Sequence, residues 1–210
     1  TSQVAQLADA LGLEQAKALQ SRADELLKGQ GLTRGGVGER IQALYKDKRY
    51  HYPNTDAGKE TLIADLMELV AATTKRLPDY FGALPKAPLQ IKRVPKAIEA
   101  AAPGGYYNQP SLDGARPGIY WLNLRDTAEY PKWALPTITY HEGVPGHHLQ
   151  LSLQQEADLP MIRRATFLSA YGEGWALYAE ELAREMGVYE GDPRGEIGYI
   201  QSSLFRAARL

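Results

Sequence analysis

The segment Tyr140–His148, which reads Tyr-His-Glu-Gly-Val-Pro-Gly-His-His, constrains this chain more than any other feature. It holds three of the chain's four histidines within eight residues. On a regular helix, His141 and His147 would be separated by about 240° of rotation and about 9 Å of rise. His148 would share a face with His141 but would lie about 10.5 Å along the axis from it. Because Pro145 lacks the amide that would bond the carbonyl of His141, and its ring crowds that carbonyl, we expect the helix to break inside the segment.

Two glutamates accompany these histidines. Glu142 lies within the segment, and Glu173 follows 25 residues after His148, within Tyr-Gly-Glu-Gly-Trp. A helical hairpin that turns near 158–160 would bring Glu173 beside the histidines. Imidazole nitrogen and carboxylate oxygen are ligands that zinc prefers, so the pattern predicts a zinc site. Two simpler interpretations stay open, namely polar groups that cap a broken helix and histidines that bind metal only adventitiously.

The composition is that of a globular chain, with 210 residues, 44% hydrophobic and 23% charged side chains. A net charge of -1 provides no positive field for nucleic acid, which we exclude as a partner. No apolar stretch approaches the roughly 20 residues of a membrane span, so we expect a soluble protein. The absence of cysteine leaves its compartment open between the cytoplasm and the periplasm or exterior. Because the chain starts at Thr1 and stops within a helical pattern at Leu210, we expect a part of a longer protein.

Periodicity predicts a mainly helical α+β fold with a small sheet. Apolar residues recur every three or four positions between Val4 and Leu27, as on one face of a helix. The same patterns predict helices at 3–28, 37–48, 56–78 and across 132–187 with breaks at Pro145 and near Pro160, and strands near 88–95 and 118–124. The stretch 103–110 is predicted as a loop. We divide the chain into a helical N-terminal part, 1–85, and a catalytic part, 86–210.

Two motifs carry a resemblance to a known family. Tyr140–Gln150 and Ala170–Glu180 resemble the paired motifs of the bacterial family known as domain of unknown function 885. That family is similar to the gluzincin metallopeptidases, in which an HExxH-type helix provides two histidines and a later helix provides a glutamate. Gly172–Ala176 also resembles the stretch around that glutamate in zinc aminopeptidases, and Gly146–Leu149 resembles one in thimet-type oligopeptidases. The resemblance covers most of the chain and implies a zincin-like catalytic domain with active-site helices.

Carried over residue by residue, the resemblance makes His141, His147 and Glu173 the zinc ligands and Glu142 the general base. His148 is the substitute candidate for the second histidine, because the His-Glu-x4-His spacing is longer than the parent pattern. The implied activity is that of a metallopeptidase, in which zinc activates a water for attack on a peptide or small amide and Glu142 takes its proton. A metal-free helical binding scaffold and a metal hydrolase of non-peptide amides are the alternatives.

Two further predictions concern the surroundings of this site. Glu180 follows Glu173 by seven residues on the same helix face, where it could orient a ligand histidine or be an ordinary solvated charge. The segment Ile119–Leu124 is predicted as an edge strand that pairs with an extended peptide substrate.

Overall fold

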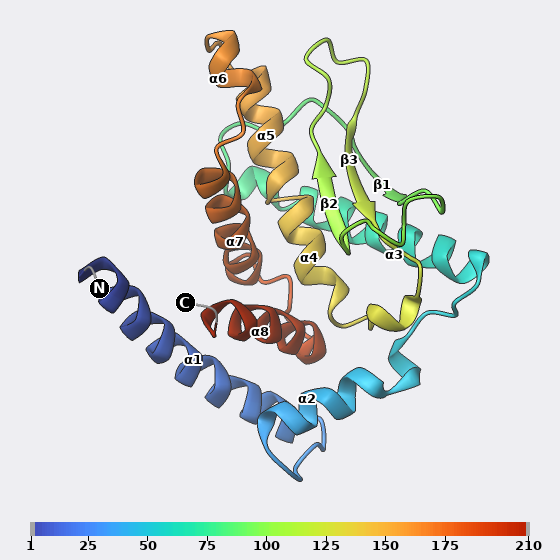
Figure 1. Ribbon diagram of the computed structural model, residues 1–210, viewed down its shortest axis with the longest axis vertical. Coiled ribbons are helices and arrows are strands. Elements are labelled where there is room, and N and C mark those ends of the chain that lie inside the picture. Colours follow the sequence, from blue (N-terminus) through green and yellow to red (C-terminus); the bar gives the residue numbers. More distant parts are fainter. Residues whose placement is uncertain (1–2, 209–210) are drawn as a thin grey trace. The chain divides into compact units, whose positions relative to one another are not determined.

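The computed structural model describes residues 3–208 (Figure 1). Side chains are described from Ala10 onward, so Val4, where the predicted apolar periodicity begins, lies outside the described side chains. The fold is mainly helical with one small sheet, as predicted. The elements are α1 (Gln3–Gly29), α2 (Val37–Lys46), η1 (Lys48–Tyr50), α3 (Asp56–Thr74), η2 (Leu77–Asp79), β1 (Leu89–Arg93), β2 (Gly105–Asn108), β3 (Gly118–Leu122), η3 (Thr127–Glu129), α4 (Leu135–Glu142), α5 (His147–Glu156), α6 (Met161–Ala165), α7 (Ser169–Glu185) and α8 (Pro193–Ala207). None of the helices within residues 3–208 is both long enough and apolar enough to cross a membrane.

The chain divides into two compact units that do not follow the predicted boundary near residue 85. One unit contains the described residues up to His51, Pro131–Thr137, and those from Tyr189 onward; the other contains Tyr52–Tyr130 and Ile138–Val188. The first unit includes the C-terminal helix because α8 packs against α1, which lies far from it in the sequence.

Apolar residues and one ion pair hold α1 and α8 together in the first unit. Ala23 and Leu27 of α1 and Ile197 of α8 are fully buried, which removes their apolar surface from water. Arg22 of α1 pairs with Glu196 of α8 at 2.9 Å between Nε and Oε1. The predicted helical periodicity therefore corresponds to a packed face at Ala23 and Leu27, whereas Leu11 is exposed.

The second unit contains a three-stranded sheet in the order β1-β3-β2, in which β3 pairs parallel to β1 and antiparallel to β2. β3 is thus the central strand, and the prediction that Ile119–Leu124 forms an edge strand is wrong. The stretch 103–110 was predicted as a loop but contains β2, an edge strand. The sequence of β2, Gly-Tyr-Tyr-Asn, shows no alternation of apolar and polar residues, so only its pairing with β3 reveals it.

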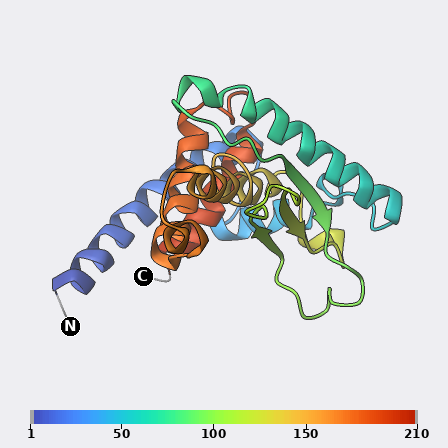
Figure 2. The same cartoon turned by 90° about the horizontal axis from the view of Figure 1, so that it is seen from above.

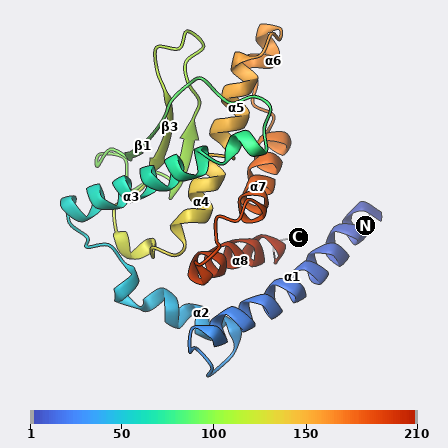
Figure 3. The same cartoon turned by 180° about the vertical axis from the view of Figure 1, so that it is seen from behind.

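Helix α3 packs against β1 of this sheet (Figure 2 and Figure 3). Its N-cap Thr55 accepts a hydrogen bond from the amide of Gly58 at 3.1 Å, and Leu62, Leu66 and Val70 are buried. The helix ends at Thr74, four residues before the predicted end. The predicted helical region 132–187 is present as α4 to α7, with breaks at the two predicted places and a third, unpredicted break at 166–168 between α6 and α7.

Candidate metal centre

The break between α4 and α5 brings His141 and His147 together. His141 is the penultimate residue of α4, and His147 is the first residue of α5. The amide of Gly146 donates to the carbonyl of Tyr140 at 3.0 Å, and a Cβ atom at Gly146 would overlap the carbonyl oxygens of Tyr140 and His141. Glycine at this position therefore allows the end of α4 and the start of α5 to approach closely. As a result, the two imidazole ring centroids lie 4.9 Å apart.

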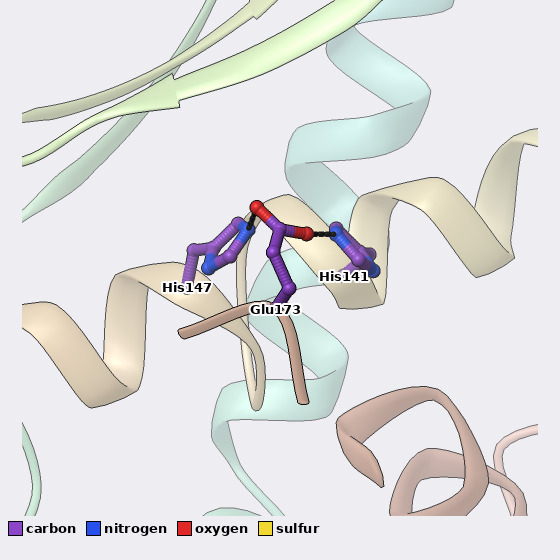
Figure 4. A group of neighbouring side chains, drawn as sticks. All are labelled: His141, His147 and Glu173. Atoms are coloured by element: carbon purple, nitrogen blue, oxygen red, sulfur yellow. Dashed lines mark ion pairs between the residues drawn. The ribbon is translucent and has the colours of Figure 1, made fainter. Parts of the chain in front are cut away.

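Glu173 of α7 completes the cluster. It lies between the two imidazoles, with Oε2 at 3.5 Å from Nε2 of His141 and Oε1 at 3.8 Å from Nε2 of His147 (Figure 4). One nitrogen or oxygen atom from each of the three residues lies within 4.8 Å of the other two. Trp175, two residues further along α7, donates from Nε1 to the carbonyl of Pro145 at 3.0 Å and so ties α7 to the break.

The donor set fits a divalent cation such as Zn²⁺. Ligands at 2.0–2.1 Å from a tetrahedral zinc lie about 3.3 Å from one another, so small side-chain shifts would bring the three residues into range. The two separations from Glu173 meet or exceed the upper limit of a hydrogen bond, so the imidazoles bond weakly to this carboxylate, whose side chain is 52% exposed. A cation between the three groups would satisfy all of them.

Glu180 lies behind His141. Its Oε1 is 2.7 Å from Nδ1 of His141, and its side chain is only 2% exposed. From this geometry we assign the proton of the neutral imidazole to Nδ1, which donates to Glu180. Nε2 of His141 then presents its lone pair toward Glu173, as a metal ligand must. Of the two interpretations of Glu180, the geometry favours the orienting one.

His147 is held in its neutral form. Burial lowers its pKa to about 4, a protonated His141 would lower it further by repulsion, and the charge of Glu173 opposes the shift. Its Nδ1 is buried and has no hydrogen-bond partner among the described residues. Neutral imidazole is the form that binds a metal.

His148 lies outside the cluster. Its Nδ1 is 2.8 Å from the hydroxyl of Tyr107, which can donate to it, and its Nε2 donates to the carbonyl of Ala87 at 3.1 Å. A Cβ atom at Gly118 would overlap both the Tyr107 hydroxyl and the His148 ring, so these groups pack tightly against β3. Both nitrogens of His148 are therefore engaged away from Glu173, and of the two candidates His147 is the one positioned as a ligand.

A cleft of about 610 Å³ opens at the cluster. It is lined by the three candidate ligands, Glu142, the β2 residues Gly105, Tyr106, Tyr107 and Asn108, and Gln109, Arg116, Leu151 and Phe167. Glu142 is 7% exposed. Burial of Tyr120, reinforced by the charge of Glu142, raises the pKa of Tyr120. The predicted general base thus shares one cleft with the predicted ligands.

Tyr107 is a cleft residue that the sequence did not single out. Its ring lies nearly parallel to that of His147, with centroids 6.4 Å apart and an interplanar angle of 19°. Burial raises its pKa, so the phenol stays protonated. Only the pairing of β2 with β3 places it beside the three candidate ligands, and no local sequence pattern indicates that pairing.

Comparisons with known proteins agree with the motifs. A family model described as "Bacterial protein of unknown function (DUF885)" matches residues 3–210. The chain belongs to this family. No curated protein matches this DUF885 chain.

Two solved structures resemble the DUF885 chain. One, described as a "putative lipoprotein" from Colwellia psychrerythraea, shares 42% sequence identity, with a TM-score of 0.92. The match covers 97% of this chain and 35% of the Colwellia chain. A second, described as a "putative lipoprotein of unknown function" from Shewanella oneidensis, is 17% identical over 94% of this chain and 37% of its own, with a TM-score of 0.71. The second likeness concerns the fold alone. The chain spans about a third of the length of these relatives.

Proposed function

We propose that this chain is the metal-binding part of a zinc-dependent hydrolase that cleaves peptide bonds, with a zincin-like arrangement of active-site helices. The observation that carries the proposal is the convergence of His141, His147 and Glu173 on one point, with Glu180 orienting the first of them. Three protein ligands leave a position open for water or substrate, as a catalytic site requires. The gluzincin-like order of ligands, two histidines followed by a glutamate on a later helix, supports the same class.

In this proposal, the bound metal and Glu142 have different roles in the reaction. Zn²⁺, when bound, would polarise the scissile carbonyl and lower the pKa of a water molecule. Glu142, which lines the cleft, would accept the proton of the attacking water and deliver it to the leaving amine. The largely buried carboxylate of Glu142 is shielded from bulk water, which strengthens its interactions with groups in the cleft.

The edge strand β2 suits an extended substrate. Gly105, Tyr106, Tyr107 and Asn108 all line the cleft, and within the described residues β2 pairs with β3 on one side only. The other edge can therefore pair with the main chain of a peptide by strand addition. This feature favours peptides over small amides as substrates.

Metal content tests the site. We expect near-stoichiometric zinc in the dialysed wild-type chain by elemental analysis, and loss of zinc in His147→Ala and Glu173→Ala. His148→Ala is the matched control, because the neighbouring histidine is buried but engaged with Tyr107 and Ala87. Absence of zinc from the wild type would instead support the scaffold interpretation.

Turnover tests the activity. We expect the zinc-loaded chain to cleave a mixture of quenched fluorescent peptides, and Glu142→Gln to retain zinc while losing at least about 100-fold in kcat. Cleavage of small amides but not of peptides would move the assignment to a non-peptide amidohydrolase. Full activity in Glu142→Gln would refute the role of this glutamate.

A further inference from the structure

A second cavity of about 830 Å³ adjoins the metal cleft, and its lining is mostly apolar. Residues of α5, α6, α7 and the links between these helices line it, together with Phe81. Its apolar lining includes Phe81, Leu149, Leu153, Ile162, Phe167 and Trp175. Such a cavity favours apolar groups, because their burial removes them from water.

Phe167 is the wall shared by the two cavities. It lines both the apolar cavity and the metal cleft, and its ring centroid lies 6.2 Å from that of His147. A Cβ atom at Gly172 would overlap the Phe167 ring, so glycine lets this ring lie directly against α7. Gly172 immediately precedes Glu173. The apolar cavity is therefore separated from the metal cluster by the thickness of one side chain.

The segment that carries Phe167 is fixed in place. The side chain of Gln154 on α5 donates from Nε2 to the carbonyls of Arg163 at 2.7 Å and Thr166 at 2.9 Å. These bonds hold the link between α6 and α7 against α5. The wall is thus built by the fold itself, which reduces the entropy lost when a ligand binds.

The lining of the cavity also includes a polar residue, Gln150. Gln150 lines it and is 8% exposed, and its Nε2 donates to Gln154 at 2.7 Å. Its buried Oε1 accepts no hydrogen bond from the described residues. Because this oxygen is buried, a ligand amide would reach it only after the Gln150 side chain turns toward the cavity.

We propose that this cavity binds a large apolar side chain, aromatic or branched, on a residue that flanks the scissile bond of the peptide. The inference rests on the proposed function, since it places cleavage in the adjoining metal cleft. Phe167 would then lie between the bound side chain and the metal cluster. The substrate class is a peptide with a bulky apolar residue at the cleavage site.

The test compares peptides that differ at one residue. Two series carry alanine, leucine or phenylalanine on either side of the scissile bond. We expect kcat/KM to be roughly 10- to 100-fold higher for phenylalanine than for alanine in one series. Ile162→Asp should abolish most of this preference, because Ile162 lines the cavity, while its 73% exposure makes the substitution tolerable to the fold. Met161→Asp is the matched control, since Met161 is 60% exposed on the same helix and is not among the cavity residues.

Measurements of peptide binding distinguish a failure of this inference from a failure of the proposed function. Calorimetric titration of both series into zinc-loaded Glu142→Gln gives the same comparison without turnover. A preference for phenylalanine in binding without any cleavage by the wild type would support the cavity and refute the hydrolase. Equal binding and equal cleavage across the series, or a preference that Ile162→Asp leaves unchanged, would overturn the inference.

Discussion

Substitution of Glu180 by glutamine tests whether the carboxylate behind His141 tunes the metal site. The Oε1 atom of Glu180 accepts from His141 at 2.7 Å, and the glutamate side chain is 2% exposed, so solvent screens the interaction little. Glutamine keeps the volume and one acceptor oxygen, removes the charge, and replaces the second oxygen by an NH2 group. A hydrogen bond to a charged group contributes about 1 kcal/mol more than a neutral one.

From this difference we expect Glu180→Gln to weaken zinc binding by about 5- to 10-fold, at or just below the lower end of the 10- to 100-fold range typical of such partners. The assay is competition for zinc between the protein and a chromophoric chelator, with thermal unfolding measured alongside. Glu181→Gln is the control, because the neighbouring Glu181 pairs with the partly exposed Arg184 on the same helix. Unchanged zinc affinity in a folded Glu180→Gln protein, or an equal loss in Glu181→Gln, would refute the reasoning.

Three further predictions concern the residues around the cluster. His148→Ala should lower the free energy of unfolding by roughly 2–4 kcal/mol in denaturant titrations, because the substitution removes the hydrogen bond with Tyr107 and leaves a cavity. The His148→Ala protein should still bind zinc, whereas the His147→Ala protein should not. Gly146→Ala should destabilise the protein by roughly 1–3 kcal/mol and weaken zinc binding, because the new Cβ atom would overlap main-chain oxygens. Gly174→Ala is the control and should be neutral or stabilising, because its Cβ atom would meet nothing within 4 Å. Equal effects of the two substitutions would contradict the close approach of α4 and α5 inferred at the break. In metal-free protein, burial lowers the pKa of His148 from its ordinary value of 6.5 to about 4, so the unfolded chain binds more protons between these values. In denaturant titrations, the contribution of His148 to the free energy of unfolding should fall by roughly 3 kcal/mol as the pH drops from 6.5 to 4, in addition to the contribution of His147, and only the His148 part should vanish in His148→Ala.

Local patterns predicted most of the elements. The periodicity of apolar residues located α1, α2, α3 and the helical region that holds the site, because each helix buries one face. The strand β2 escaped prediction, since four residues without alternation carry no local signal. The two-unit division also escaped it, because the contact of α8 with α1 joins segments more than a hundred residues apart.

The sequence by itself determined which groups are available for chemistry and why the helix that holds them must break. Pro145 removes an amide and Gly146 removes a Cβ atom, so His141 and His147 cannot belong to one regular helix, and this much follows from covalent structure alone. Tertiary structure decided which histidine faces Glu173, because Tyr107 and the main chain of Ala87 engage His148 from other parts of the chain. Distances between atoms far apart in sequence depend on packing, and no local pattern encodes them.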